Sequence, residues 1–170
     1  MRKPLVRLII SLAIAFAAAG IGSIFTISAI PTWYAELAKP SFNPPNWVFG
    51  PAWTLLYTLM GVALFRVWNS KPAAGTDHAG PTKAPTKPAR TLAFTLFGVQ
   101  LVLNALWSIV FFGCHQLGPA LIVIAALWVA ILACIVTFWR LERTAALLLL
   151  PYLAWVTFAS LLNFAVWRLN

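Results

Sequence analysis

The chain has 170 residues, of which 62% are hydrophobic and only 9% are charged. A water-soluble domain usually carries about 25% charged residues, so this composition excludes a soluble globular protein. The length leaves room for one domain. We therefore predict an all-α integral membrane protein that folds as a single domain over residues 1–170.

Long apolar segments recur along the chain. A helix needs about 20 apolar residues to cross about 30 Å of hydrocarbon, and backbone groups in lipid must find their partners within the helix. The segments that qualify are approximately 5–28, 47–69, 91–113, 118–139 and 145–167. They predict a five-transmembrane-helix bundle in which short loops join antiparallel neighbours.

The first of these segments has a second interpretation. Its basic start and the apolar run LIISLAIAFAAA are also typical of a signal peptide, with Ala15-Phe16-Ala17 as a cleavage site. The apolar run continues to Ile30, however, which is longer than a signal peptide requires. We therefore predict that the first helix is retained.

The formal net charge of +9 would suit a nucleic-acid-binding protein, but the positions of the basic residues indicate a membrane topology instead. Ten of the twelve Lys and Arg residues fall on the same side of the predicted bundle as the N-terminus, and only Lys39 and Arg168 fall on the opposite side. An excess of Lys and Arg marks the cytoplasmic side. We predict no nucleic-acid partner, and a multi-pass protein of a bacterial cell membrane with a cytoplasmic N-terminus and an outer C-terminus. The basic residues on the cytoplasmic side are Arg2, Lys3, Arg7, Arg66, Lys71, Lys83, Lys87, Arg90, Arg140 and Arg143.

Residues 70–90 separate the second and third spans. They are rich in Pro, Ala, Thr and Lys and have no apolar periodicity, which predicts a flexible cytoplasmic linker. The basic residues of this linker are expected to face anionic headgroups, which makes membrane lipid a predicted partner.

Residues 30–46 form a loop of a different kind, because aromatic residues alternate with prolines. Proline fixes its own φ and restricts the residue before it. A rigid aromatic loop is costly to leave in water, so we expect it to pack on the outer end of the bundle as a cap. The alternative is an interfacial belt of aromatic side chains. The predicted cap residues are Trp33, Pro40, Phe42, Pro44, Pro45 and Trp47.

No Asp, Glu, Lys or His lies in the middle of a predicted span. The acids Glu36, Asp77 and Glu142 all fall in loops or at helix ends. Pumps typically use ionisable groups within the membrane, so the sequence favours a bulky apolar ligand over an ion. Roughly 24 Å of helix separates Cys114 from Cys134, too far for a disulfide. No metal site is predicted, because Cys114 and His115 lack further ligands nearby.

Polar and aromatic residues within the spans share helix faces. Gln100, Asn104 and Trp107 follow helical spacing in the third span, and Trp53 and Tyr57 lie one turn apart in the second. Because an amide in hydrocarbon needs partners, these faces should point inward together. They could form interhelical hydrogen bonds alone or line a ligand pocket. The face in the fifth span comprises Tyr152, Trp155, Ala159, Leu162 and Asn163.

Three stretches carry a further signal. They are WYAELAKPSFNPPNWVFGPAWTLLYTLMG at 33–61, QLVLNALW at 100–107 followed by FFG, and PYLAW at 151–155 with the residues that follow it. Together they resemble the tryptophan-rich sensory protein family (TspO/MBR), which includes translocator proteins and peripheral-type benzodiazepine receptors. The resemblance covers nearly the whole chain except the linker and much of the first helix.

The resemblance implies a five-helix bundle whose first loop covers a cavity open toward one membrane face. It implies tetrapyrrole ligands such as protoporphyrin IX, with sterols and synthetic aromatic drugs as others, and no required cofactor. The inward helix faces had already selected most of the positions that the family assigns to the cavity. Those positions are Trp53, Tyr57, Asn104, Trp107, Trp155, Ala159 and Asn163.

Two departures limit this transfer. The cholesterol motif of animal members needs a Tyr where this chain has Phe164, which argues against sterol binding. Family members often dimerise through small residues of the third helix, where Thr95 and Val99 fit poorly. The first helix offers another small-residue face for a homodimer. That face comprises Ala15, Ala18, Ala19, Gly20 and Gly22.

The function predicted from these observations is a membrane receptor or carrier for tetrapyrroles, in sensing or in control of porphyrin traffic. A rival is an enzyme that degrades protoporphyrin IX with light and oxygen, for which Trp53 and Trp155 would be the oxidisable residues. The sequence has no nucleophile–base set, so such chemistry would come from the ligand. A third alternative is a structural bundle without a ligand.

Overall fold

The computed structural model describes residues 2–70 and 87–170, and within these ranges the secondary structure is entirely helical. Five helical stretches are long and apolar enough to cross a membrane. Large apolar side chains such as Ile24, Ile27 and Ile122 are exposed on the outside, as lipid-facing residues are. The helices are α1 (Arg2–Ala29), α2 (Trp33–Glu36), η1 (Asn46–Val48), α3 (Phe49–Asn69), α4 (Lys87–Ser108), η2 (Ile109–Gly113), α5 (Leu117–Leu141), α6 (Arg143–Leu148) and α7 (Leu150–Leu169).

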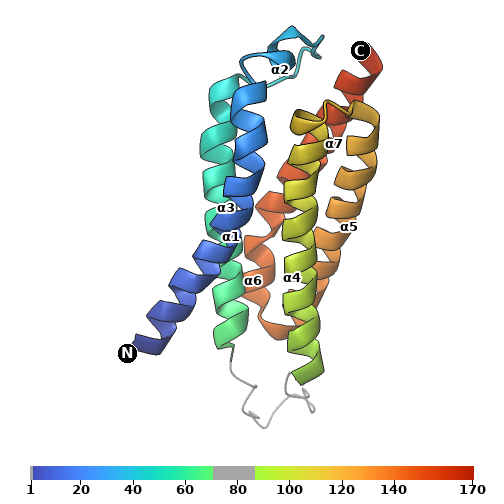
Figure 1. The fold of residues 1–170 in the computed structure, drawn as a ribbon. Helices are drawn as coiled ribbons and strands as arrows, with labels where there is room; N and C mark the ends of the chain where they lie inside the picture. The colour runs from blue at the N-terminus through green and yellow to red at the C-terminus, as the bar shows by residue number, and fades with distance from the viewer. Residues whose placement is uncertain (1, 71–86) are drawn as a thin grey trace.

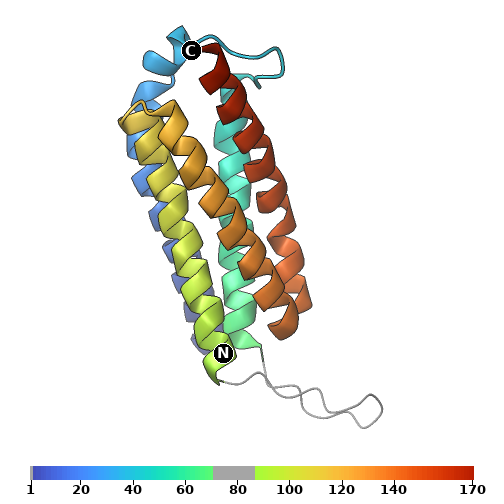
Figure 2. The ribbon, with the colours of Figure 1, turned by 90° about the vertical axis from the view of Figure 1, so that its right-hand side faces the viewer.

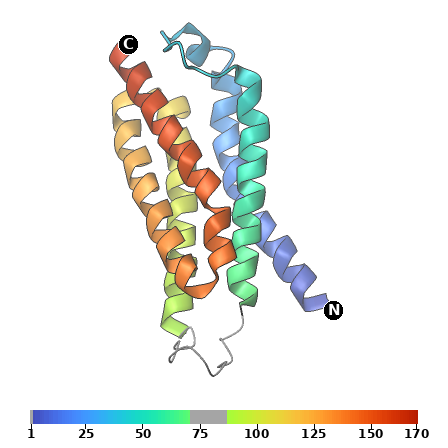
Figure 3. The same cartoon turned by 180° about the vertical axis from the view of Figure 1, so that it is seen from behind.

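The helices form one bundle in which α1 packs against α3 and α4, and α5 packs against α4, α6 and α7. Figures 1 and 2 place α2 and the C-terminus at one end, which we call the cap end. The N-terminus, the end of α3 and the start of α4 lie at the other end, which we call the linker end (Figure 3). Opposite ends for the two termini follow from an odd number of spans. Which end is cytoplasmic stays a prediction.

The helix boundaries differ from the approximate predicted ones by a few residues, most notably in the third and fifth spans. Residues 87–90, assigned to the linker, form the first turn of α4, and residues 71–86 lie outside the described residues. The fifth span begins at Arg143, two residues earlier than predicted, and is interrupted at Leu149, where α6 ends and α7 begins. Pro151 explains the new start, because proline has no N–H to donate and fits the first turn of a helix.

The short turn before α6 is fixed by Glu142. Its carboxylate accepts a hydrogen bond from the backbone N–H of Ala145 (2.6 Å) and pairs with the guanidinium of Arg66 on α3 (2.9 Å). The hydrogen bond from Arg66, followed by that from Ala145, holds the pKa of the Glu142 carboxyl below its ordinary value of 4.5. This residue therefore caps α6 and ties it to α3 at once.

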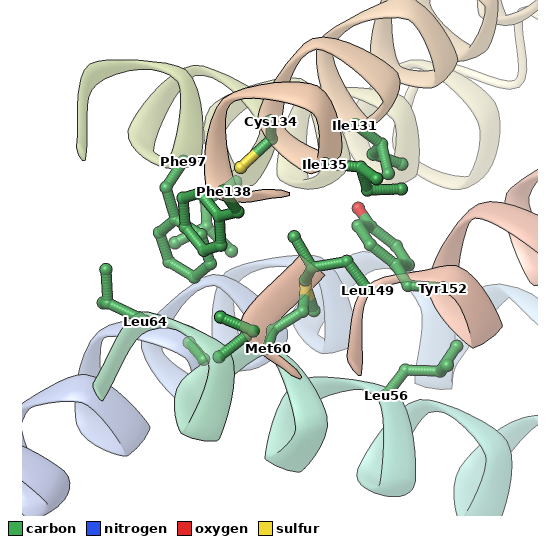
Figure 4. Close-up of a cluster of buried hydrophobic side chains, with 14 of the residues drawn as sticks. Leu56, Met60, Leu64, Phe97, Ile131, Cys134, Ile135, Phe138, Leu149 and Tyr152 are labelled. Atoms are coloured by element: carbon green, nitrogen blue, oxygen red, sulfur yellow. The ribbon is translucent and has the colours of Figure 1, made fainter. Parts of the chain in front are cut away.

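A large apolar cluster joins α1, α3, α4, α5, α6 and α7 (Figure 4). A smaller one lies around Tyr34, Phe111 and Phe112. Phe97 of α4 and Phe138 of α5 lie face to face with ring centroids 6.1 Å apart. Gly61 lets α1 reach α3, because a Cβ at residue 61 would lie 2.7 Å from Leu12 Cδ2 and 2.9 Å from Leu12 Cα. A side chain at this crossing would push the two helices apart.

The α4 helix ends in a π-helical turn, η2, rather than continuing regularly. Cys114 N–H donates to the carbonyl of Ile109 (2.8 Å), and His115 takes a positive φ of 57° to turn the chain into α5. The wider turn buries Phe111 and Phe112 at the cap end. Such turns often occur at functional sites. Cys114 and Cys134 are free thiols, in agreement with the predicted lack of a disulfide.

Candidate functional site

The cap half of the bundle encloses a cavity of about 500 Å³. Its walls come from the second half of α1, the start of α3, the end of α4 with η2, and the middle of α7. Among the residues that the structure describes, no Asp, Glu, Lys, Arg or His lines it. The lining residues are Phe16, Ala19, Gly20, Gly22, Ser23, Thr26, Ile27, Ile30, Tyr34, Asn46, Phe49, Gly50, Trp53, Thr54, Tyr57, Trp107, Ser108, Phe111, Phe112, Trp155, Phe158, Ala159, Leu162 and Asn163.

Flat aromatic rings make up much of the wall. On α3 the indole of Trp53 stacks on the ring of Tyr57, with centroids 5.4 Å apart, and meets Trp155 of α7 edge to face at 6.3 Å. On the opposite side Trp107 stacks on Phe111 at 5.1 Å. Because these rings hold one another in place, the cavity has broad, neutral surfaces of fixed orientation.

A hydrogen-bonded network lies below the cavity. The Tyr57 hydroxyl donates to Asn104 Oδ1 (2.5 Å), and Asn104 Nδ2 donates to the Tyr152 hydroxyl (2.9 Å). One amide thus links α3, α4 and α7. Gln100, one turn deeper, has its Nε2 3.9 Å from the sulfur of Met60, and its Oε1 has no hydrogen-bond partner.

A second polar contact connects α4, α5 and α7 inside the wall. Trp107 Nε1 donates to Asn163 Oδ1 (3.2 Å), and Asn163 Nδ2 donates to the carbonyl of Leu117 (3.0 Å). These bonds fix the indole of Trp107 edge-on to α7. They also satisfy the carbonyl of the first residue of α5.

The structure brings most of the predicted site residues to the cavity and leaves three outside it. Gln100, Asn104 and Tyr152 are buried beneath the floor, where they act as the interhelical links of the alternative interpretation. The inward faces extend beyond the cavity, so helical spacing alone could not separate wall from support. Ligand binding by the others stays a prediction. The predicted residues that line the cavity are Trp53, Tyr57, Trp107, Trp155, Ala159, Leu162 and Asn163.

The segment 30–48, which we call the cap segment, lies over the cap end of the cavity. Tyr34 is only 3% exposed, and its hydroxyl donates to Asn43 Oδ1 (2.8 Å). Burial raises the pKa of the Tyr34 phenol to about 12. The backbone of Ala38 makes two hydrogen bonds of 3.0 Å with the side-chain amide of Asn170 at the end of α7. The cap segment is therefore tied to itself and to the bundle.

None of the predicted cap residues lines the cavity. The cap-segment residues that do are Ile30, Tyr34 and Asn46. Trp33 stacks on His115 with centroids 4.2 Å apart, and Phe42 meets Phe158 of α7 at 6.4 Å. These two rings fasten the cap segment from outside.

The remaining predicted cap residues lie further out. Pro40 and Pro44 are half-buried, and Pro45 is exposed. Trp47 is 74% exposed, which fits the interfacial-belt interpretation for that residue. Both interpretations therefore describe part of the cap segment.

The polar and aromatic faces of the second, third and fifth spans did not predict the wall contributed by α1. Ser23 and Thr26, three residues apart, and Ala19 and Gly22 place small and hydroxyl-bearing residues on one helix face. That spacing was the available signal.

Three of the small residues of α1, Ala15, Ala18 and Gly22, lie in the bundle interior, whereas Gly20 is exposed. Ala15 and Ala18, assigned to a dimer face, are buried within the protein. A Cβ at Gly22 would lie 3.0 Å from Ser108 Oγ of α4, so this glycine allows α1 and α4 to approach closely. The proposed dimer face was therefore misplaced at these positions.

Fold and cavity together define a multi-pass α-helical membrane protein with a neutral, aromatic-walled cavity under a short helical cap. The chain belongs to the TspO/MBR family, whose model matches residues 9–168.

Relatives from three different lineages match most of the chain. It is 46% identical over 159 residues to the tryptophan-rich protein TspO of Archaeoglobus fulgidus, covering 94% of this chain and 91% of the relative. It is 40% identical over 149 residues to the protein CrtK of Rhodobacter capsulatus (88% and 83%). It is 39% identical over 150 residues to the human translocator protein (88% and 82%). Membership of this family supports a membrane receptor role.

Proposed function

We propose that the protein is a membrane receptor or carrier that holds a tetrapyrrole such as protoporphyrin IX in the cavity between α1, α3, α4 and α7. The observation that carries this proposal is that three indoles, those of Trp53, Trp107 and Trp155, line one uncharged cavity of about 500 Å³. Pockets for small molecules usually measure about 300–1,000 Å³ and combine apolar walls with a few polar groups.

The chemistry of the wall suits a flat, mostly apolar macrocycle. Aromatic faces stack on a conjugated ring, and the rigid ring contacts described above reduce the entropy lost on binding. Hydroxyl groups of Ser23, Thr26 and Thr54 lie among them and can orient polar substituents. An inorganic ion would find no charged partner in this lining.

The test is a titration of the purified protein with protoporphyrin IX in the dark, in which tryptophan fluorescence is the readout. Binding in the cavity should quench this fluorescence. Trp53→Phe and Trp155→Phe should each weaken binding. The matched control is Trp139→Phe on the exposed face of α5, which should bind as the wild type does. Equal affinity in all three variants would remove the cavity as the binding site.

Illumination in air then separates a receptor from the rival enzyme. The rival draws on the proximity of Trp53 and Trp155, whose ring centroids are 6.3 Å apart in the same wall. A porphyrin spectrum that survives illumination supports the receptor. Loss of the spectrum together with one defined product, abolished by Trp53→Phe or Trp155→Phe, would support degradation instead.

A further inference from the structure

The walls of the cavity differ in how far they are covered. On the side of η2 and α7, Phe111, Phe112, Leu162 and Asn163 are all buried. On the side of α1 and α3, several lining residues are exposed, among them Phe16 at 40% and Ile27 at 72%. The other exposed lining residues are Gly20, Asn46, Gly50 and Thr54, and all of them belong to α1, η1 or α3.

The contact between α1 and α3 explains this asymmetry. The helices touch at Leu12 and Gly61, and one turn further toward the cap end Phe16 meets Tyr57 with ring centroids 6.1 Å apart. Continuing along the same helix face, Gly20 of α1 follows Phe16 at a spacing of four residues. A Cβ built at Gly20 would have no heavy atom within 4 Å.

The edge of α3 that faces α1 also carries a glycine with open space around it. Gly50 and Thr54 precede Tyr57 by seven and three residues, which places them on its helix face. A Cβ at Gly50 would also have no heavy atom within 4 Å, and Thr54 donates its hydroxyl only to the carbonyl of Gly50 (2.9 Å). The seam between α1 and α3 is therefore closed at Phe16 and Tyr57 and open beside the two glycines.

The cap segment covers the alternative route, toward water. It is fastened to α7 through Ala38 and Asn170 and through Phe42 and Phe158, and to η2 through Tyr34, which packs on Phe111 and Phe112. The open seam, by contrast, lies inside the membrane-spanning stretches Lys3–Ala29 and Asn46–Asn69. Because these stretches are apolar enough to cross a membrane, we expect the open seam to face lipid rather than water.

We propose that ligands enter and leave the cavity sideways, from the cap-side half of the bilayer, between α1 and α3 past Gly20 and Gly50. The proposal rests on the proposed function in that a ligand occupies this cavity. It specifies the class of ligand, an apolar molecule dissolved among lipid acyl chains. The glycines keep the passage open, because any larger side chain would project into it.

Two substitutions test the passage without disturbing the fold. In Gly20→Leu/Gly50→Leu the added Cβ atoms have no heavy atom within 4 Å, and leucine favours the helix more than glycine does. The matched control is Gly98→Leu on α4, which also has no atom within 4 Å of an added Cβ, is exposed, and does not line the cavity.

The first measurement is kinetic. Protein in phosphatidylcholine vesicles is mixed with donor vesicles that carry protoporphyrin IX, and tryptophan quenching is followed in both directions of transfer. The double variant should lower both the association and the dissociation rates by at least about tenfold, because both pass the same constriction, whereas the loss of a wall contact alone would raise the dissociation rate. Gly98→Leu should match the wild type. Wild-type rates in the double variant would overturn the lateral passage while leaving the cavity as a binding site.

The second measurement needs no porphyrin. An apolar diazirine dissolved in the bilayer labels accessible side chains on illumination, and mass spectrometry locates the label. Leu162, buried at 7% on the far wall, should be labelled in the wild type and protected in the double variant, whereas Ile122 on the outside should be labelled in both. An unlabelled Leu162 beside a labelled Ile122 would overturn the proposal. Labelled Leu162 in a protein that fails to bind porphyrin would retain the passage and reject the proposed ligand.

Discussion

The two halves of the bundle use the same helices for opposite purposes. In the linker half, Gly61 brings α1 against α3, and rings such as Phe97 and Phe138 fill the interior. In the cap half the same two helices flank a cavity whose aromatic residues support one another around empty space. Close packing in one half thus supplies the stability that allows the other half to stay hollow.

The boundary between the halves is the network of Tyr57, Asn104 and Tyr152. Its hydrogen bonds join three helices at the floor of the cavity. Substitutions in the linker half should therefore change the stability of the protein. Substitutions in the walls of the cavity should instead change its affinity for the ligand.

The largest effect is expected in the closely packed half. Gly61→Leu places a side chain within 2.9 Å of the Leu12 backbone, so overpacking should destabilise the protein by about 3 kcal/mol. Thermal unfolding in detergent would measure this loss. Gly98→Leu, with open space around its Cβ, should leave the unfolding temperature unchanged. If both variants unfold alike, the crossing of α1 and α3 is not tightly packed.

The next effect concerns the floor. Asn104→Leu leaves the hydroxyls of Tyr57 and Tyr152 buried without Asn104, which should cost about 2 kcal/mol of stability. Gln100→Leu on the same helix removes a carbonyl oxygen that has no partner, so its unfolding free energy should stay within about 0.5 kcal/mol of the wild type. Equal losses in the two variants would show that burial of an amide, rather than this network, matters.

Above the floor the effect should move from stability to affinity. Ala159 lines the cavity between Trp155 and Asn163, so Ala159→Leu should reduce protoporphyrin affinity at least about tenfold, about 1.4 kcal/mol. Its unfolding temperature should barely change. Ala154→Leu, on the exposed face of the same helix, is the control and should affect neither. A destabilised Ala159→Leu that binds normally would instead make this residue a packing notch.

The cap segment should have a smaller influence on affinity. Pro44→Gly/Pro45→Gly frees two backbone positions, and ordering each costs about 1 kcal/mol or more on binding if the segment loosens in the free protein. We expect weaker porphyrin binding with the bundle still folded, measured by titration and circular dichroism. Unchanged affinity would reduce these prolines to connectors at the membrane surface.

The smallest effect is at the linker end and depends on pH. The pKa of Glu142 is lowered in the folded protein, so its pairing with Arg66 stabilises the fold above the ordinary carboxyl value of 4.5 and is lost as pH falls through the lower folded value. Because the pair is partly exposed, the contribution should stay below about 1 kcal/mol. Glu142→Gln should flatten the decrease in unfolding temperature below pH 4.5. A decrease of the same size in the variant would assign it to other groups.

Sequence reasoning located the spans well, because about 20 apolar residues between polar loops have only one stable arrangement in lipid. It was less accurate where backbone chemistry acts locally, as at Pro151, which divides the fifth span. For the cavity it found the walls that carry a polar or aromatic signature, on α3, α4 and α7. The wall on α1 was not predicted, since glycine and alanine are as typical of a contact between two helices as of a cavity wall.

The sequence by itself determined the class of protein, the five spans and the inward faces of three of them, because hydropathy and helical period are properties of each segment alone. Only the tertiary structure decided which inward residues meet one another and which face a void. Asn104 and Trp107 share one face of α4, yet Asn104 bridges two tyrosines below the floor and Trp107 lines the cavity above it. That difference depends on contacts between residues far apart in the chain, such as the hydrogen bond from Asn104 to Tyr152.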